Sequence, residues 1–213
     1  MKSWTKIVCI TSFVFQIVAC SSSTQTNDSR PVQTLQKGIQ HNAEGKRNVD
    51  IPAVYKDKLK GLEAFKGQVT HVKDGDTIDV KVNGKKQTVR LLLLDTPESV
   101  SQKIPPQKMG EEASTFLKKQ LGGKSVTMVY DHGPKEDKYG RKLAYVFCEG
   151  IHINELMVKS GYGIIAYISK QNTTLLPQML DAEKEAKASK IGVWSIKGFV
   201  DEKKRNYNRN DAA

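Results

Sequence analysis

The stretch RLLLLDTPE, residues 90–98, constrains the fold of this chain more than any other segment. Four consecutive leucines favour a buried β-strand, because a strand covered on both faces needs apolar side chains at every position. Yet Arg90 precedes the leucines, and Asp95 and Glu98 follow them closely. Burial of charged groups is costly unless they are paired, so the two ends of this strand must reach a surface or a polar site.

The segments around this strand predict an α+β fold. Residues 68–95 contain three strand patterns, separated by a turn at Asp74-Gly75 and a hairpin at Asn83-Gly84. Later segments predict, in order, a helix within 106–123, strands at 124–131 and 141–150, a helix at 153–161, a helix at 173–190 begun by Thr173 or Thr174, and a packed segment at 191–195. Five short strands in an antiparallel sheet can close as an OB-type barrel, which commonly binds nucleic acid. The pattern alone leaves this barrel as one option among several.

The N-terminus has the pattern of an export signal. Lys2 and Lys6 are followed by a mostly apolar run that ends at Ala19 and is too short to span a bilayer. The sequence IVAC before three serines resembles a bacterial lipoprotein cleavage site, at which Cys20 becomes the lipidated first residue. Ordinary cleavage beside an incidental cysteine is the alternative. We expect a signal peptide at 1–19 and a lipidated flexible tether at 20–62, where aliphatic residues are few.

The chain is basic and offers no disulfide framework. Lys and Arg outnumber Asp and Glu by 34 to 23, and the formal charge of +11 attracts polyanions such as nucleic acid, acidic polysaccharide or an anionic membrane. Solubility alone would also explain the charge. Once the signal is removed and Cys20 carries lipid, Cys148 is the one remaining thiol, so no bridge can form within the chain.

Acidic side chains gather at predicted strand ends and turns: Asp74, Asp76, Asp95 and Glu98. The four histidines show no zinc-type spacing, and no Cys–His cluster is present. Any metal would therefore have oxygen ligands, which favours Ca²⁺ or Mg²⁺. The tripeptide Asp74-Gly75-Asp76 alone is equally typical of an ordinary turn.

Two arginines begin predicted strands. Arg90 opens the leucine strand and Arg141 opens RKLAYVF. A guanidinium can bind two phosphate oxygens at once, which lysine cannot match. Each arginine on its own could equally be a solvated residue at a strand edge.

Four motifs together resemble one known family. KDGDTI, RLLLLDTPE, DKYGRKLAY and GVWS resemble the thermonucleases, the staphylococcal-nuclease-like family, in order and spacing over about residues 65–195. The resemblance implies an OB-type five-stranded β-barrel with three helices, which we assign to residues 63–195. Residues 196–213 then form a basic tail, for which we expect mobility.

The resemblance also implies roles for particular residues. Asp76 and Asp95 would bind Ca²⁺ together with the backbone carbonyl of Thr96, and Asp74 would lie in the outer environment of the metal. Glu98 would orient or deprotonate the attacking water. Arg90 and Arg141 would hold the reacting phosphate and stabilise the transition state.

Substrate contacts follow from the same resemblance. Lys138 and Tyr139 match family positions that contact a terminal phosphate and sugar, and Tyr167 matches a tyrosine that packs near the base. Ser169 stands where the family usually has a second tyrosine, so one stacking ring is missing. Plain packing is the alternative role for the two tyrosines. The segment 99–110 is also shorter than the common family loop.

These roles impose a geometric condition. Along a straight strand, Arg90 and Asp95 would lie roughly 16 Å apart and on opposite faces. Both can serve one phosphate only if the strand bends or bulges, so we predict an irregularity between Leu91 and Asp95. Arg90, Asp76, Asp95, Glu98 and Arg141 should then enclose a common pocket.

The sequence thus predicts a calcium-dependent, sequence-nonspecific endonuclease that hydrolyses DNA and RNA and leaves 3′-phosphate ends. We expect it on the extracellular face of a bacterial membrane, held by its lipid or shed from it, with no obligate protein partner. The alternative is a noncatalytic nucleic-acid-binding OB module at the cell surface. A degenerate module should have lost at least one of Arg90, Glu98 and Arg141, and this chain keeps all three.

Overall fold

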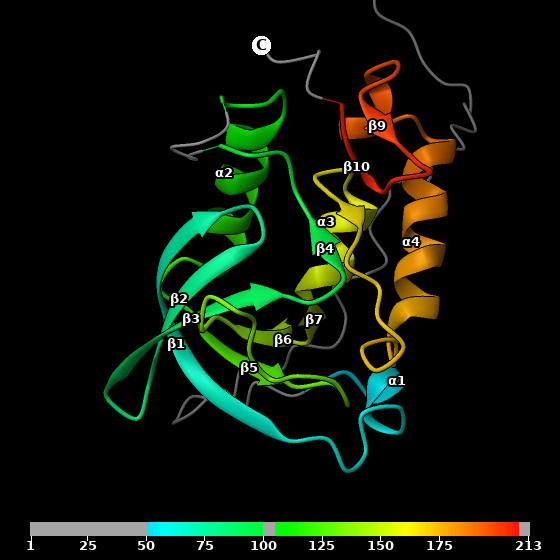
Figure 1. Ribbon diagram of the computed structural model, residues 1–213. Helices are drawn as coiled ribbons and strands as arrows, with labels where there is room; N and C mark the ends of the chain where they lie inside the picture. Colours follow the sequence, from blue (N-terminus) through cyan, green and yellow to red (C-terminus); the bar gives the residue numbers. More distant parts are fainter. Residues whose placement is uncertain (1–50, 100–104, 209–213) are drawn as a thin grey trace, which may run out of the picture. The chain divides into compact units, whose positions relative to one another are not determined.

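Five strands close into a barrel in this computed structural model, which describes residues 51–99 and 105–208 (Figure 1). The strands are β1 (Ala64–Asp74), β2 (Thr77–Val82), β3 (Lys85–Leu91), β5 (Ser125–Val129) and β6 (Lys142–Cys148). All neighbours pair antiparallel except β3 and β6, whose parallel pairing closes the barrel. The predicted α+β class with an OB-type five-stranded barrel is confirmed, although one pair is parallel where we expected antiparallel strands throughout.

Both predicted turns between the first three strands are present. The β1–β2 connection is the Asp74–Asp76 turn, and Asp74 pairs with Thr77 across it. The β2–β3 hairpin turns at Asn83 and Gly84, whose φ angles are 48° and 82°. Positive φ at both central residues is what a tight hairpin of this hand requires, and Asn-Gly tolerates it.

The leucine run passes from the barrel into a second, smaller sheet. Leu91 ends β3, and β4 (Leu94–Asp95) pairs antiparallel with β8 (Ile164–Ile165). All four leucines are buried, between 0% and 6% exposed. Uninterrupted apolar sequence is needed here because core residues surround the segment on all sides. Asp95 lies where the chain leaves that core.

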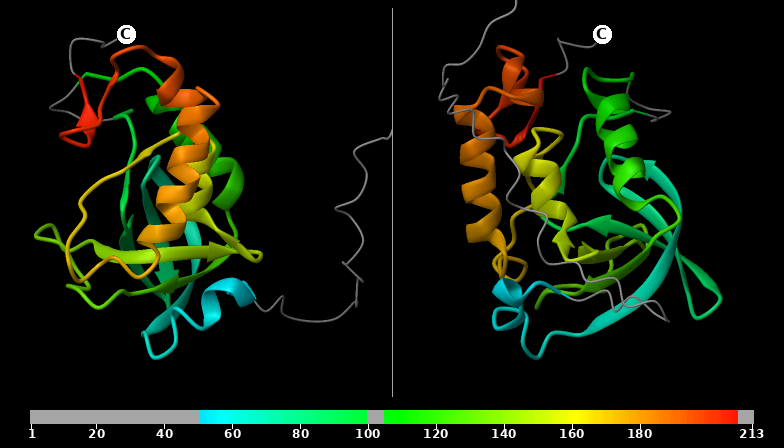
Figure 2. Two further views of the ribbon diagram at one scale, coloured as in Figure 1. Left: turned by 90° about the vertical axis from the view of Figure 1, so that its right-hand side faces the viewer. Right: turned by 180° about the vertical axis from the view of Figure 1, so that it is seen from behind.

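Four α-helices occur in the described residues where we expected three. The expected ones are α2 (Gly110–Leu121), α3 (Ile153–Lys159) and α4 (Leu176–Ala188), and α3 and α4 lie side by side (Figure 2). The extra helix is the single turn α1 (Ala53–Lys56). None of the helices in the described ranges is long and apolar enough to cross a membrane.

The predicted cap of α4 was wrong. The helix begins at Leu176 with Leu175 as its N-cap. Thr174 instead donates its hydroxyl to Asp131 at 2.6 Å, which ties the loop before α4 to the end of β5. The predicted packed segment after α4 is a 3₁₀ helix, η1 (Gly192–Ser195), with Val193 fully buried.

The packed part of the chain extends beyond residues 63–195 at both ends. Tyr55 and Leu59 belong to the main core and are 8% and 5% exposed, although we assigned them to a flexible tether. After η1, strands β9 (Val200–Asp201) and β10 (Asn206–Tyr207) form a hairpin, and Phe199 is fully buried. The expected mobility of the tail is therefore wrong for residues 196–208. The signal peptide and Cys20 lie outside the described residues.

Candidate active site

The Asp74–Asp76 turn packs directly onto the chain that follows the leucine run. A Cβ atom on Gly75 would lie 2.7 Å from Thr96 Oγ1 and 2.9 Å from Ala113 Cβ of helix α2. Only glycine fits at this close approach. The turn is thereby held against Thr96, and Asp74 and Asp76 are brought to the same place as Asp95.

The predicted irregularity between Leu91 and Asp95 is confirmed. The chain turns at Leu92 and Leu93, and Leu93 has a φ of 58°. The turn folds Asp95 back over the end of β3. As a result, Arg90 Nη2 donates to Asp95 Oδ1 at 3.0 Å and to the Leu94 carbonyl at 3.1 Å.

Arg90 also contacts Asp76, so one guanidinium joins both predicted metal ligands. Its Nη1 donates to Asp76 Oδ1 at 2.6 Å. Asp76 is 3% exposed, and its other oxygen accepts from the amide and the hydroxyl of Thr96, both at 3.2 Å. Asp76 is therefore fixed by groups from β3 and from the segment after β4.

These residues line a cavity of about 280 Å³. Its lining comprises the four carboxylates and Arg90 together with Thr96, Gln107, Tyr167, Asn206 and Tyr207. The structure thus brings together Asp74, Asp76, Arg90, Asp95, Thr96, Glu98 and Tyr167 of the predicted site. We call it the acidic cavity.

The acidic cavity holds more negative charge than Arg90 neutralises. Burial, followed by the charge of Asp76, raises the pKa of Asp74 to about 7. The same two causes, in the same order, raise the pKa of Asp95 to about 6. Raised carboxyl pKa values of this origin mean that the site favours an added positive charge, either a proton or a cation.

The donor chemistry of the cavity suits a hard divalent cation such as Ca²⁺ or Mg²⁺. Its carboxylates are hard oxygen donors, which is the ligand type that Ca²⁺ and Mg²⁺ take. Within residues 51–99 and 105–208, no three His, Cys, Asp or Glu side chains are arranged to hold a metal ion. The Arg90 guanidinium joins Asp76 and Asp95 instead. A cation bound there would use the carboxylates of Asp76 and Asp95 and the backbone carbonyl of Thr96.

The prediction of one pocket shared by all five residues is wrong for Arg141, which does not line the acidic cavity. Its Nε and Nη2 atoms both lie 2.6 Å from Asp137 Oδ2, and its amide donates to Asp137 Oδ1 at 3.0 Å. It lines an adjoining cavity of about 550 Å³, together with Lys138 and Tyr139. Because Arg90 and Tyr167 line both cavities, Arg141 is a neighbour of the acidic cavity but does not share it.

The predicted substrate-binding tyrosines are exposed. Tyr139 is 72% and Tyr167 is 70% exposed, so packing does not account for either ring. The Tyr167 hydroxyl donates to Asp95 Oδ1 at 3.1 Å, and the Arg90 guanidinium lies 5.3 Å from the centre of its ring. Lys138 and Arg141 lie 5.1 and 5.5 Å from the centre of the Tyr139 ring.

Sequence reasoning missed three residues at the site. The Gln107 side-chain oxygen accepts a hydrogen bond from the Glu98 backbone amide, and the Gln107 backbone amide donates to the Glu98 carbonyl, each at 2.8 Å. Asn206 and Tyr207 come from the hairpin assigned to the tail. The aromatic residues Phe199 and Tyr207 could have indicated that this segment is packed, because large apolar side chains in a polar segment favour burial.

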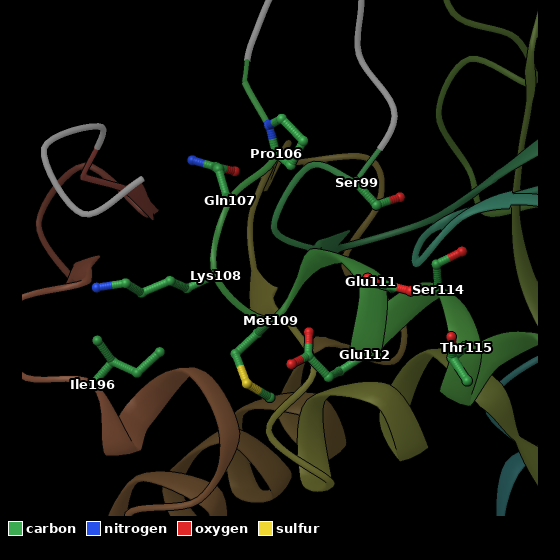
Figure 3. Close-up of a pocket in the computed structure, with 10 residues that line it drawn as sticks. All are labelled: Ser99, Pro106, Gln107, Lys108, Met109, Glu111, Glu112, Ser114, Thr115 and Ile196. Carbon is green, nitrogen blue, oxygen red and sulfur yellow. The ribbon is translucent and has the colours of Figure 1, made fainter. Parts of the chain in front are cut away.

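A larger groove adjoins the acidic cavity at Gln107. It has a volume of about 690 Å³ and lies along the start of α2, where Met109 and Glu112 line it (Figure 3). None of the predicted catalytic or metal-binding residues lines it. We therefore assign the chemistry to the smaller acidic cavity.

Comparison with known proteins identifies the family of the chain. Residues 88–196 match the family model described as staphylococcal nuclease homologue. An uncharacterised protein of Bacillus anthracis is 79% identical over the full length of both chains. Endonuclease YncB of Bacillus subtilis is 42% identical over 127 residues, which cover 60% of each chain. A thermonuclease of Staphylococcus hyicus is 38% identical over 128 residues, 60% of this chain and 75% of that one. The chain therefore belongs to the family of staphylococcal nuclease homologues.

Proposed function

We propose that this protein is a calcium-dependent, sequence-nonspecific endonuclease that hydrolyses phosphodiester bonds of DNA and RNA. The observation that carries the proposal is the acidic cavity, in which Arg90 lies between Asp76 and Asp95. A cluster of carboxylates beside a guanidinium suits a reaction that needs both a cation and a donor to an anionic phosphate. The nuclease names of two relatives support the same reaction class.

Asp76, Asp95 and the Thr96 carbonyl would hold the calcium, with Asp74 in its outer environment. When bound, the ion would reduce the repulsion between an anionic phosphodiester and an incoming oxygen nucleophile. Asp76 enters this role already oriented, because Thr96 donates to it through both its amide and its hydroxyl.

Glu98 is the proposed general base. Its backbone is held on both sides by Gln107, which limits where the carboxylate can move. It takes a proton from the attacking water, whose oxygen then bonds to phosphorus while the P–O5′ bond breaks. One product keeps a 3′-phosphate, and the O5′ atom of the other takes a proton from solvent to become a 5′-hydroxyl.

Arg90 and Arg141 would stabilise the negative charge that builds on the phosphate. Arg90 lines both the acidic cavity and the adjoining one, so it can contact a phosphate at their boundary. Arg141 lines the adjoining cavity and would approach from that side. Removal of one such donor typically costs about 10²–10³-fold in rate.

A basic groove continues the substrate path. Another cavity, of about 750 Å³, is lined by Tyr139 and Arg141, which also line the adjoining cavity. Its other lining residues include the cations Lys73, Lys85, Lys86 and Lys142. Lysines along a groove bind the phosphate backbone without reading sequence. Lys138 and Tyr139 would contact a terminal phosphate and sugar. Tyr167 would stack on a base, at about 1–3 kcal/mol, and Ser169 supplies no second ring beside it.

The proposed location follows from the N-terminus. Lipidation of Cys20 after removal of residues 1–19 would hold the enzyme at the outer face of the membrane. Cys20→Ala should release the protein into the medium, as measured by fractionation of cells. Continued membrane association of that variant would require another anchor.

Digestion of nucleic acid by the purified mature chain (residues 20–213) tests the function. We expect it to cut single-stranded and double-stranded DNA and RNA with millimolar-range calcium, as weak extracellular calcium sites require, and to lose activity in chelator. The products should need removal of a 3′-phosphate before a polymerase extends them. Tight, salt-sensitive binding without cleavage at any calcium level would instead identify the noncatalytic binding module.

A further inference from the structure

The C-terminal hairpin contributes to the acidic cavity, although it lies outside the region that defines the family match. The match ends at residue 196, whereas β9 and β10 span Val200–Tyr207. Two hairpin residues, Asn206 and Tyr207, line the acidic cavity. Figure 1 shows the hairpin beside the C-terminal end of α4, where Lys187 pairs with Glu202 at 2.8 Å.

The hairpin is fixed by packing and by a partly buried ion pair. The Phe199 and Tyr207 rings stack at 5.1 Å and form a small core with Ile164 and Val193. Arg205 Nη1 donates to the Ile165 carbonyl at 2.9 Å and lies 3.2 Å from Glu183 Oε2. These contacts anchor the hairpin to β8, the strand that pairs with β4 and Asp95.

Tyr207 holds one end of the peptide group that joins Asp95 to Thr96. Its hydroxyl donates to the Asp95 carbonyl at 2.8 Å. The amide at the other end of the same peptide group, Thr96 N–H, donates to Asp76 Oδ2 at 3.2 Å. Because a peptide group is planar and rigid, hydrogen bonds at its two opposite ends restrain the whole group.

We propose that the hairpin completes the active site and that Tyr207 is a positioning residue for calcium binding. By holding the Asp95–Thr96 peptide, Tyr207 restrains the backbone that carries the Asp95 carboxylate on one side and the Thr96 carbonyl on the other. Both groups are ligands under the proposed function, on which this inference rests. Preorganised ligands bind more tightly because less ordering remains to be done when the ion binds.

Substitution of Tyr207 separates positioning from packing. Tyr207→Phe removes only the hydroxyl and keeps the buried ring, whereas Tyr207→Leu removes both the hydroxyl and the ring stacking. Tyr55→Phe is the matched control, because Tyr55 is equally buried at 8% exposure and donates its hydroxyl to Glu155 outside the acidic cavity. All four mature chains, wild type included, are compared.

Two measurements decide the proposal. In calcium-free protein, amide hydrogen exchange at Asp95 and Thr96 should be about three- to tenfold faster in Tyr207→Phe than in wild type, the size expected for loss of one buried hydrogen bond. Calcium titration by calorimetry should show a similar loss of affinity, and saturating calcium should restore turnover. Tyr55→Phe should match wild type in both measurements.

The outcomes distinguish this inference from the proposed function. If Tyr207→Phe matches wild type in exchange and in calcium affinity while Tyr207→Leu is impaired, Tyr207 only packs and the positioning role is overturned. If wild type neither binds calcium nor cuts nucleic acid, the proposed function fails and the calcium role of Tyr207 fails with it. Exchange at Thr96 still reports whether the hydroxyl orders the peptide.

Discussion

Arg90, near the end of β3, donates a 2.6 Å hydrogen bond to Asp76, which directly precedes the neighbouring strand β2. The same guanidinium also contacts Asp95, so it pairs with two carboxylates at once. A lysine has a single ammonium group and cannot bridge both in this planar geometry. These two ion pairs therefore explain why an arginine directly precedes the four leucines.

Arg90→Lys should keep the charge and lose the bridge. We expect turnover to fall by about 10²–10³-fold, because the fork that binds two phosphate oxygens is lost. Stability should also fall, since Asp76 and Asp95 lose hydrogen-bond donors while buried. Steady-state kinetics at saturating calcium and urea unfolding measure the two effects. Turnover equal to wild type would remove Arg90 from the chemistry.

Glu98→Gln should separate binding from catalysis. The amide keeps the size of the side chain but cannot accept a proton from water, so turnover should fall by about 10² or more. The affinity for DNA, measured in calcium-free buffer, should stay within about twofold of wild type because no phosphate-binding cation is changed. Glu112→Gln, on the neighbouring groove, is the matched control and should cut DNA like wild type. Normal turnover in Glu98→Gln would leave the base unidentified.

Asp137→Asn should weaken substrate binding and leave calcium binding intact. Asp137 accepts hydrogen bonds from the Tyr139 and Arg141 amides and pairs with the Arg141 guanidinium, so it shapes the whole turn. Its loss should raise KM severalfold through misplacement of Tyr139 and Arg141. Glu136→Gln, which changes the adjacent carboxylate paired with Lys142, should have a smaller effect. An unchanged KM would show that the turn is ordered without Asp137.

The strands and helices were predictable because their signals are local, whereas their closure into a barrel was implied by the family resemblance. The Asn83-Gly84 hairpin and the helical spacing of α2 depend on neighbours in sequence. The packing of Tyr55, Phe199 and Tyr207 was not predictable in this way. Each lies in a polar segment and becomes buried only through contacts with residues far along the chain.

The same distinction holds at the site. The four carboxylates and Arg90 could be assigned from motifs, and the bend that brings Arg90 to Asp95 followed from strand geometry. The hydrogen bonds of Gln107 to Glu98 and of Tyr207 to Asp95 join segments with no shared motif. The pairing of Arg141 with Asp137 depends on the shape of a turn that composition does not specify.

Tyr55→Ala should destabilise the domain, although Tyr55 does not line the acidic cavity. Its ring packs against Phe147 and His152, with centroids 5.6 and 5.2 Å away, and its loss should cost about 3 kcal/mol in the free energy of unfolding. Val54→Ala, on the exposed face of the same helix at 65% exposure, should change it by less than about 0.5 kcal/mol. Equal effects of the two changes in urea unfolding would show that α1 does not pack on the core. A chain that begins at residue 63 should be destabilised for the same reason.

His152 should make the stability of the domain depend on pH. Burial lowers its pKa below the ordinary value of 6.5, and the ring stacks on Phe147 at 4.9 Å. The folded protein therefore resists protonation of His152, whereas the unfolded chain takes up a proton there as the pH falls through about 6.5. At this residue the unfolded state binds more protons, so the contribution of His152 to stability falls with falling pH, by up to about 1.4 kcal/mol per pH unit.

Urea unfolding of calcium-free protein between pH 5 and pH 8 measures this effect. His152→Asn should be less stable than wild type at pH 8, because the aromatic stacking is lost, and should lose less stability between pH 7 and pH 5. His71→Asn, at an exposed position on β1, should keep the slope of wild type. If His152→Asn also keeps that slope, the acid sensitivity arises from other groups. Asp74 and Asp95 are not among them, because their raised carboxyl pKa values act in the opposite direction. Those two groups bind protons more readily in the folded state, so their contribution stabilises the protein as the pH falls.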